Sequence, residues 1–213
     1  CNAHLGVFAY ELLFRTPTRT APPEAANTDA ATSSVILAAF QDIGIERLAG
    51  NRPIAINLSS GLLDRAASFP APPQRVILDL PPELARAQNL PVLRELKSLG
   101  FTLALNDFEF SARLAPVYEL LDMVKIDVRA TDGARLSRLP KLLARLGVRS
   151  VAKKVETLDE YEQLRDQGFE LFQGYFLSRP RKLQAKNLAA GKHALLTLLT
   201  TLYNPHSETG EIE

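Results

Sequence analysis

The 213-residue chain carries 25 Lys and Arg against 24 Asp and Glu, a formal net charge of +1, and 46% of its residues are hydrophobic. This charge balance gives no reason to expect a nucleic acid polymer or an anionic membrane as a partner. Cys1 is the single cysteine, which excludes an internal disulfide, and no apolar run approaches membrane-spanning length. We therefore expect a soluble, cytoplasmic protein.

Short apolar, β-rich runs alternate along the chain with amphipathic segments. Gly100, Gly147 and Gly168 each end a predicted helix directly before a predicted strand, as helix-terminating glycines do. The predicted strands are residues 7–15, 53–58, 75–80, 101–105, 124–128, 149–155 and 171–177. The predicted helices are residues 29–41, 82–99, 113–121, 134–146 and 158–166.

This alternation predicts an α/β fold with a parallel sheet. Several strands are continuously apolar, which is typical of a parallel sheet covered on both faces. The pattern fits a TIM-like (β/α)8 barrel better than a doubly wound sheet, because neither a dinucleotide-binding loop nor a P-loop follows any strand. An eighth strand is expected near residues 37–47 or upstream of Cys1. We expect residues 1–203 to form the barrel domain and residues 204–213 to be a polar tail or linker towards a missing C-terminal domain.

Polar side chains gather at the predicted strand ends. In a barrel, the carboxyl ends of all strands meet at one mouth. Carboxylates, amides and lysines suit Mg²⁺ or Mn²⁺, and two such ions suit phosphodiester hydrolysis. A single one of these groups is more simply a helix cap or loop contact, but the whole set is harder to explain in that way. The candidates are Glu11 and Arg15 on the first strand, then Asn57, Asp79, Asn106, Asp107, Lys125, Lys153, Glu156 and Gln173.

Five motifs in order resemble those of the EAL-domain cyclic-di-GMP phosphodiesterases. They are Tyr10-Glu11-Leu12-Leu13-Phe14-Arg15, Ile56-Asn57-Leu58-Ser59, Ile77-Leu78-Asp79-Leu80, Val124-Lys125-Ile126-Asp127 and Phe172-Gln173-Gly174-Tyr175. The resemblance implies a TIM-like barrel whose first strand is antiparallel to the rest. It also implies two Mg²⁺ or Mn²⁺ ions in active members, which open the cyclic dinucleotide to the linear form.

The resemblance also implies roles for the matched residues. Metal ligands would come from Glu11, Asn57 and Asp79, with Asp107 and Glu156 as further acidic members. Lys125 would orient the nucleophilic water. Gln173 would complete the mouth, and Arg15 would face a substrate phosphate.

Two departures from the family pattern weaken the predicted metal site. Where active members have Asp-Asp-Phe-Gly-Thr-Gly, this chain has Asn106-Asp107-Phe108-Glu109-Phe110-Ser111, so an amide replaces a carboxylate. Where they have Ala-Glu-Gly-Val-Glu-Thr, it has Ala152-Lys153-Lys154-Val155-Glu156-Thr157. The mouth thereby becomes three charge units less negative. Because a unit charge pair about 4 Å apart is worth about 4 kcal/mol at an effective dielectric of 20, two-metal hydrolysis is not expected to survive.

The leading hypothesis is therefore a degenerate EAL domain that works as a regulatory or protein-interaction module. We expect the Lys153 ammonium to lie at or beside an emptied metal position and to pair with Asp107 or Glu156. The alternatives are a phosphodiesterase with residual metal-dependent activity and a receptor that binds cyclic-di-GMP without cleaving it. The Tyr10–Arg15 pattern and the helical segment 195–203 also resemble proteins that join an EAL-like domain to an HDOD domain, which implies a protein partner or fused signalling domain of that type.

Overall fold

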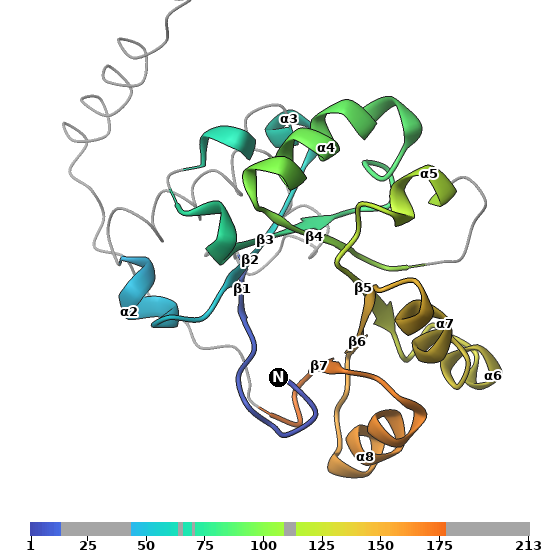
Figure 1. The fold of residues 1–213 in the computed structure, drawn as a ribbon. Helices are drawn as coiled ribbons and strands as arrows, with labels where there is room; N and C mark the ends of the chain where they lie inside the picture. The colour runs from blue at the N-terminus through green and yellow to red at the C-terminus, as the bar shows by residue number, and fades with distance from the viewer. Residues whose placement is uncertain (14–43, 64–65, 70, 109–113, 178–213) are drawn as a thin grey trace, which may run out of the picture. The chain divides into compact units, whose positions relative to one another are not determined.

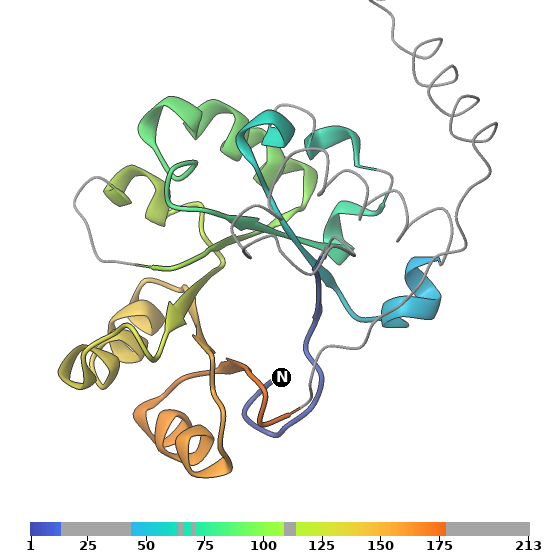
Figure 2. The ribbon, with the colours of Figure 1, turned by 180° about the vertical axis from the view of Figure 1, so that it is seen from behind.

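A computed structural model of the chain describes residues 1–13, 44–63, 66–69, 71–108 and 114–177, all within one compact unit, Cys1–Arg181. In this unit seven strands form one sheet in the order β1-β2-β3-β4-β5-β6-β7, and every neighbouring pair is parallel. The sheet curls, and the helices that connect its strands lie on its outer side (Figures 1 and 2). The domain boundary expected at residue 203, and the tail beyond it, lie outside the described residues.

The seven strands occur where the hydrophobic pattern predicts them, but the helices match it only in part. Residues 45–49 and 60–63 form helices that were not predicted, and the α-helix expected over residues 82–99 begins only at Leu90. All seven predicted strands are present, and all except β5 are shorter than predicted: β1 (Tyr10–Leu12), β2 (Ile54–Asn57), β3 (Val76–Leu80), β4 (Thr102–Leu105), β5 (Met123–Asp127), β6 (Arg149–Lys153) and β7 (Leu171–Gln173). The helices are α2 (Ile45–Ala49), α3 (Ser60–Leu63), α4 (Leu90–Leu99), α5 (Ala115–Tyr118), α6 (Gly133–Leu136), α7 (Leu139–Arg145) and α8 (Leu158–Gln167). The predicted helix at residues 29–41 lies outside the described residues.

The ends of α4 and α8 confirm the glycine signals. Gly100 follows α4 with φ 99° and Gly168 follows α8 with φ 103°, a left-handed geometry that glycine adopts without steric cost. At its other end, α8 is capped by the Thr157 hydroxyl, which accepts a hydrogen bond from the Glu160 amide. No helix among the described residues is long and apolar enough to cross a membrane.

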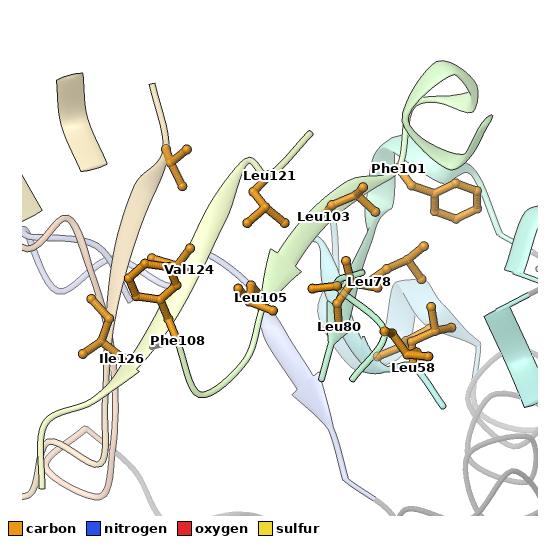
Figure 3. Close-up of a cluster of buried hydrophobic side chains, with 14 of the residues drawn as sticks. Leu58, Leu78, Leu80, Phe101, Leu103, Leu105, Phe108, Leu121, Val124 and Ile126 are labelled. Carbon is orange, nitrogen blue, oxygen red and sulfur yellow. The ribbon is translucent and has the colours of Figure 1, made fainter. Parts of the chain in front are cut away.

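The continuously apolar strands bury both of their faces. Alternate residues such as Leu78, Leu103 and Val124 point outward into the large core between sheet and helices (Figure 3). The intervening residues form a second, smaller core inside the curl, which consists of Ala55, Ile77, Ala104, Met123, Val151 and Leu171. Because side chains alternate with a period of two, the residue two positions after each inner-core residue also points inward, at the carboxyl end of its strand.

The expectation of an antiparallel first strand is wrong, since β1 pairs with β2 in parallel. Antiparallel pairing occurs just before it, where an isolated bridge joins Asn2 to Leu171 of β7. A tight turn then reverses the chain: the Leu5 amide donates to the Asn2 carbonyl at 3.0 Å, and Leu5 has φ 60°. The turn explains the difference, because the chain passes along β7 in one direction and returns in the other as β1.

The eighth strand expected near residues 37–47 is also absent from the part of that segment that the structure describes. Residues 44–47 lead into and form the first turn of α2, and residues 37–43 lie outside the described ranges. Ile45 and Ala49 are four positions apart and both are buried in the outer core, which is the spacing of one helical face.

Candidate functional site

The inward register places most of the predicted polar residues at one edge of the sheet. Asn57 pairs in register with Asp79, and Lys153 with Gln173. Each follows a residue of the inner core by two positions, as Asp79 follows Ile77. The alternation of side chains along each strand therefore explains why the polar groups converge. In each strand, an inward-facing apolar residue is followed two positions later by an inward-facing polar residue at the strand end.

One group of side chains, here called the Lys125 cluster, consists of Glu11, Asp79 and Lys125. The Lys125 ammonium donates to Asp79 Oδ2 and, at 3.2 Å, to Glu11 Oε2. The side chains of Asp79 and Lys125 are 0% and 6% exposed. Gln173 adds a hydrogen bond from its Nε2 to Glu11 Oε2 at 2.7 Å. The cluster is an ion triad that links β1, β3 and β5, and Gln173 connects it to β7.

Burial and charge compete in setting the pKa values of the Lys125 cluster. For Asp79, burial dominates and raises the pKa to about 6, although the Lys125 charge opposes this shift. For Glu11, burial raises the pKa, but the Lys125 charge and the hydrogen bonds from Gln173, Lys125 and Asn57 outweigh it and leave the pKa lowered. Burial lowers the pKa of Lys125, yet the two carboxylates reverse that effect and hold it above its ordinary value. Lys125 is therefore a permanent cation between the two acids.

Two asparagines connect the Lys125 cluster to the next strand ends. Asn57 Nδ2 donates to Glu11 Oε1 at 3.3 Å, and its Oδ1 accepts from Asn106 Nδ2 at 3.2 Å. An amide can serve in this chain because it has a donor and an acceptor at the same position. Asn106, which replaces a family carboxylate, thus uses its NH₂ group in a contact that an aspartate could not make.

A second group, here called the Lys153 cluster, consists of Asn106, Asp107 and Lys153. The Lys153 ammonium donates to Asn106 Oδ1 at 3.2 Å and to Asp107 Oδ1 at 2.9 Å. Its side chain is 18% exposed, whereas that of Asp107 is 64% exposed. Of the two partners expected for Lys153, Asp107 or Glu156, the structure shows Asp107.

Glu156 does not pair with Lys153. Its carboxylate lies 3.3 Å from Arg129, which also binds Glu160 at 2.7 Å. Glu156 is half-exposed, and its backbone N–H donates to Glu160 Oε2 at 2.9 Å. It follows Val155 in the turn that leads into α8, where the chain has already left the inward register of β6. Glu156 therefore belongs to a surface ion network beside the mouth.

The left-handed residue Lys154 provides a contact that the sequence pattern did not reveal. Lys154 has φ 65° at the position where the family pattern has glycine, and its ammonium lies 2.5 Å from Asp127 Oδ2 at the end of β5. Burial of Asp127 raises its pKa, but the hydrogen bonds from Lys154 and from the Arg129 backbone prevail and leave it lowered. A signal for this contact was available in the sequence, because Asp127 directly follows Lys125 and Ile126. Asp127 ends β5, and β5 pairs with β6, which ends at Lys153, next to Lys154.

Gly174 fixes the position of Gln173 through a close backbone approach. A Cβ atom added to Gly174 would lie 1.8 Å from the Val155 carbonyl oxygen. In the observed arrangement the Val155 amide donates to the Gln173 carbonyl at 3.1 Å. Only glycine fits in the space between the ends of β6 and β7, so Gly174 keeps these two strand ends in contact.

A cavity of about 110 Å³ adjoins the Lys125 cluster. Its polar lining is Glu11, Lys125 and Gln173, and the remainder is mostly apolar, including Phe8, Ala55, Ile77, Met123 and Val151. The polar groups therefore close one side of the hollow inside the curled sheet. Since they bond to one another across the strands, they form a connected layer rather than a set of free donors.

The described residues do not fit a two-metal centre. Among them, no group of three or more His, Cys, Asp or Glu side chains is placed to hold a metal ion. Both oxygens of Glu11 accept hydrogen bonds, and the Asn57 oxygen accepts one from Asn106. Asp79 Oδ1 is buried and has no hydrogen-bond partner in the described part of the chain, but the Lys125 ammonium binds the same carboxylate. The Lys125 ammonium thus lies between Glu11 and Asp79, two of the carboxylates that a metal ion would need.

Of the ten predicted site residues, eight come together in or beside the two clusters. Glu156 lies in the surface network with Arg129, and Arg15 lies outside the described residues. Sequence reasoning missed Lys154, Asp127 and Arg129 as participants at the strand ends. The eight are Glu11, Asn57, Asp79, Asn106, Asp107, Lys125, Lys153 and Gln173.

Proteins of known sequence resemble the chain over most of its length. It is 30% identical over 208 residues to the uncharacterized protein YuxH of Bacillus subtilis, covering 92% of this chain and 49% of YuxH. It is 27% identical over 215 residues to the cyclic di-GMP phosphodiesterase CdgJ of Vibrio cholerae, covering 100% of this chain and 50% of CdgJ. The chain thus spans about half the length of these relatives.

Solved structures share the fold. The BlrP1 protein of Klebsiella pneumoniae, in a complex with manganese and cyclic di-GMP, matches with a TM-score of 0.61 and 28% sequence identity, over 80% of this chain and 51% of that one. The sequence model described as EAL domain matches residues 25–180, which excludes β1 and Glu11 but includes the six other strands. With its curled parallel sheet and TIM-like fold, the chain belongs to the EAL domain family.

Proposed function

We propose that this chain is an EAL domain without two-metal phosphodiesterase activity, which acts as a regulatory or protein-interaction module in signal transduction. The observation that supports this proposal is the position of the Lys153 ammonium, 2.9 Å from Asp107 Oδ1 and 3.2 Å from Asn106 Oδ1. The acid that remains there is neutralised by the chain's own cation. A divalent ion at this place would have to displace an ammonium held by two oxygens.

The Lys125 cluster matches the family pattern, so the difference from active members lies in the Lys153 cluster. Glu11 and Asp79 share the Lys125 ammonium. With Asp107 paired to Lys153, and Asn106 in place of a carboxylate, little net negative charge remains for metal ions. Hard divalent cations require anionic oxygen ligands, so charge, and not only geometry, opposes their binding.

Titration calorimetry with Mn²⁺ and Mg²⁺ tests this proposal. The wild-type chain should show no tight site for either ion. The double variant Asn106→Asp with Lys153→Glu restores the two acids of the family pattern and should gain Mn²⁺ affinity of at least about a hundred-fold, as the change of three charge units implies. Lys141→Glu, which makes an equal charge reversal to that of Lys153→Glu but on α7, is the matched control and should gain nothing. Tight two-site binding by the wild type would refute the proposal.

A second candidate function is a receptor that binds cyclic-di-GMP without hydrolysing it. It is favoured by the partly exposed Lys153 ammonium, because a cation at the mouth can contact a phosphate group without any metal. Binding of cyclic-di-GMP measured in EDTA would support this receptor, and Lys153→Ala should then abolish it. Hydrolysis in Mn²⁺ that is lost on Glu11→Ala would instead support a residual phosphodiesterase. No binding in either condition leaves the interaction module as the function.

The partner of such a module would be a signalling protein or a fused domain. The sequence resemblance to EAL-HDOD proteins favours an HDOD-like domain in this role. Mixing the purified chain with separately produced HDOD domains, followed by size-exclusion chromatography, tests this assignment. A stable complex is expected, and the absence of co-elution with any HDOD domain would contradict it.

A further inference from the structure

A row of side chains, here called the amide relay, links the ends of β6, β4 and β2 to β1 and consists of Lys153, Asn106, Asn57 and Glu11. The Lys153 ammonium donates to Asn106 Oδ1 at 3.2 Å, and Asn106 Nδ2 donates to Asn57 Oδ1 at 3.2 Å. Asn57 Nδ2 in turn donates to Glu11 Oε1 at 3.3 Å. The amide relay therefore joins the Lys153 cluster to the Lys125 cluster by successive hydrogen bonds.

The two ends of the amide relay fix the direction of every bond in it. An ammonium can only donate hydrogen bonds and an ionised carboxylate can only accept them, whereas each amide has one side that donates and one that accepts. Turning Asn106 alone would bring its NH₂ group to the Lys153 ammonium and its oxygen to Asn57 Oδ1. Turning both amides would restore the contact between them but would break the contacts at both ends. One orientation of the two amides therefore satisfies all the groups.

This direction depends on the two positions at which the chain departs from the family pattern. An aspartate at position 106 could accept from Lys153, but it would place an oxygen against Asn57 Oδ1 and could not donate to it. A glutamate at position 153 would leave Asn106 Oδ1 without its donor. Oxygens that face one another in this way suit a bound cation, whereas Lys153 and Asn106 together supply N–H donors instead. The two departures therefore work as one unit.

Glu11 depends on the amide relay for one of its two oxygens. Gln173 and Lys125 both donate to Glu11 Oε2, at 2.7 and 3.2 Å. The described residues give Oε1 a single donor, the Asn57 amide. The carboxylate is thus held from both sides, and the donor on one side is oriented by Asn106.

We propose that Lys153 is a positioning residue for Glu11, which it reaches through the fixed orientations of Asn106 and Asn57. Lys153 itself contacts Asn106 and Asp107, so its effect on Glu11 has to pass through the two amides. Its ammonium is then more than a counter-charge for Asp107, because it determines which atom of each amide faces the next group. The proposal holds whether or not the mouth binds a nucleotide, and the titration with Mn²⁺ does not decide it.

Nuclear magnetic resonance of the isotope-labelled chain at one fixed pH tests the proposal. The signals to follow are the solvent exchange of the side-chain NH₂ protons of Asn57 and Asn106 and the carboxyl carbon resonance of Glu11. Lys153→Met removes the first donor and should speed the exchange at both asparagines by about fivefold or more, the effect of losing a hydrogen bond. The Glu11 resonance should shift in the same variant. Unchanged exchange at Asn57 would overturn the proposal, because a lysine with only a local role would affect Asn106 alone.

Two controls separate the amide relay from a general effect of charge. Lys154→Met removes the neighbouring ammonium, which pairs with Asp127 outside the relay, and should leave the exchange at Asn57 unchanged. Asp107→Asn removes the charge of the other partner of Lys153 and should also leave it unchanged, because the bond from Lys153 to the relay remains. If either control speeds the exchange at Asn57 as much as Lys153→Met does, the effect comes from charge and the proposal is wrong.

Asn106→Asp tests the relay from its middle. It keeps the Lys153 ammonium but puts an oxygen against Asn57 Oδ1, so the Asn57 amide should turn and withdraw its donor from Glu11. The Glu11 resonance should therefore shift as it does in Lys153→Met, and an unchanged resonance would contradict the relay. Circular dichroism checks the folding of every variant, and Lys153→Ala replaces a Lys153→Met protein that fails to fold, with the same results expected.

Discussion

The Lys125 and Lys153 clusters both place an ammonium between side-chain oxygens at strand ends, but they differ in depth and in the freedom of their partners. The Lys125 cluster is enclosed, since the Asp79 and Lys125 side chains are 0% and 6% exposed. The Lys153 cluster opens to solvent through Asp107, whose side chain is 64% exposed and whose φ of 46° is left-handed. A buried charge must keep its partner, whereas an exposed one can exchange it for water.

This difference suggests separate roles for the two lysines. Lys125 holds the architecture of the mouth together, because its loss would leave two acids without a counter-charge. Lys153 sets the electrostatics of the mouth while contributing little to stability. Substitution at position 153 can therefore alter the chemistry of the site without disturbing the fold.

The largest expected effect is on stability, from Lys125→Ala. It should lower the free energy of unfolding at neutral pH by about 3–5 kcal/mol, the typical cost of removing one member of a buried ion pair. Lys153→Ala is the matched control and should cost less than about 1 kcal/mol, as for a partly exposed pair. Urea denaturation of both variants measures the difference, and equal costs would contradict the distinction between the clusters.

Gly174→Ala should break the contact between the ends of β6 and β7. Because the new Cβ would lie 1.8 Å from the Val155 carbonyl oxygen, the backbone has to move, and we expect a loss of about 3 kcal/mol. Gly133→Ala is the control, since no atom lies within 4 Å of a Cβ placed there. Thermal unfolding compares the two, and a Gly174→Ala protein as stable as Gly133→Ala would show that the approach is not required.

The pH dependence of stability should distinguish Asp79 from Glu11. Burial raises the pKa of Asp79 from 3.8 to about 6, so the folded state binds this proton more tightly than the unfolded state does. The resulting stabilisation is present at low pH and is lost as the pH rises from about 4 to about 6, by about 2–3 kcal/mol.

Glu11 should show the opposite sign. Its pKa is lowered in the fold, so its stabilisation is present above its ordinary value of 4.5 and is lost as the pH falls below it. Urea denaturation of the wild type, Asp79→Asn and Glu11→Gln from pH 4 to 7 measures the contribution of each carboxyl group to the free energy of unfolding. The stability of the wild type relative to Asp79→Asn should fall with rising pH, and a constant difference would rule out the raised pKa.

The smallest expected effect comes from the left-handed residue Lys154. Lys154→Gly relieves a backbone geometry that costs an L-residue about 1 kcal/mol, but it also removes the exposed ion pair with Asp127. Lys154→Ala removes the same ion pair and keeps the strain. The glycine variant should therefore be about 1 kcal/mol more stable than the alanine variant by urea denaturation. If the alanine variant is equally stable, the φ of 65° does not store strain.

Much of the fold could be predicted from local patterns. The strands were recognisable because runs such as residues 76–78 and 103–105 are continuously apolar, which fits elements buried on both faces. Gly100 and Gly168 marked helix ends because the left-handed conformation that ends a helix has no steric cost for glycine. The direction of β1 could not be inferred in this way, since it depends on the turn between Asn2 and Gly6 and on pairing with distant strands.

The residues of the candidate site could be predicted from the sequence, but the contacts between them could not. The order of the motifs indicated that Glu11, Asp79 and Lys125 meet, and the departures at Asn106 and Lys153 were visible as changes of charge. Which acid Lys153 binds was left open between Asp107 and Glu156. In the structure Lys153 binds Asp107, because the strand register brings these two residues together and Glu156 lies beyond the inward-facing residues of β6.

By itself, the sequence determined the order of strands and helices, the polar residues at the strand ends and the loss of three units of negative charge at the mouth. Those properties are local, since they follow from side-chain chemistry and from periods of two and of 3.6 residues. Only the tertiary structure decided that Lys125 pairs with Glu11 and Asp79, that Lys153 pairs with Asp107, and that Glu156 lies apart from the mouth. Hydrogen bonds, ion pairs and burial depend on distances between residues far apart in the chain, and these distances exist only once the strands have paired.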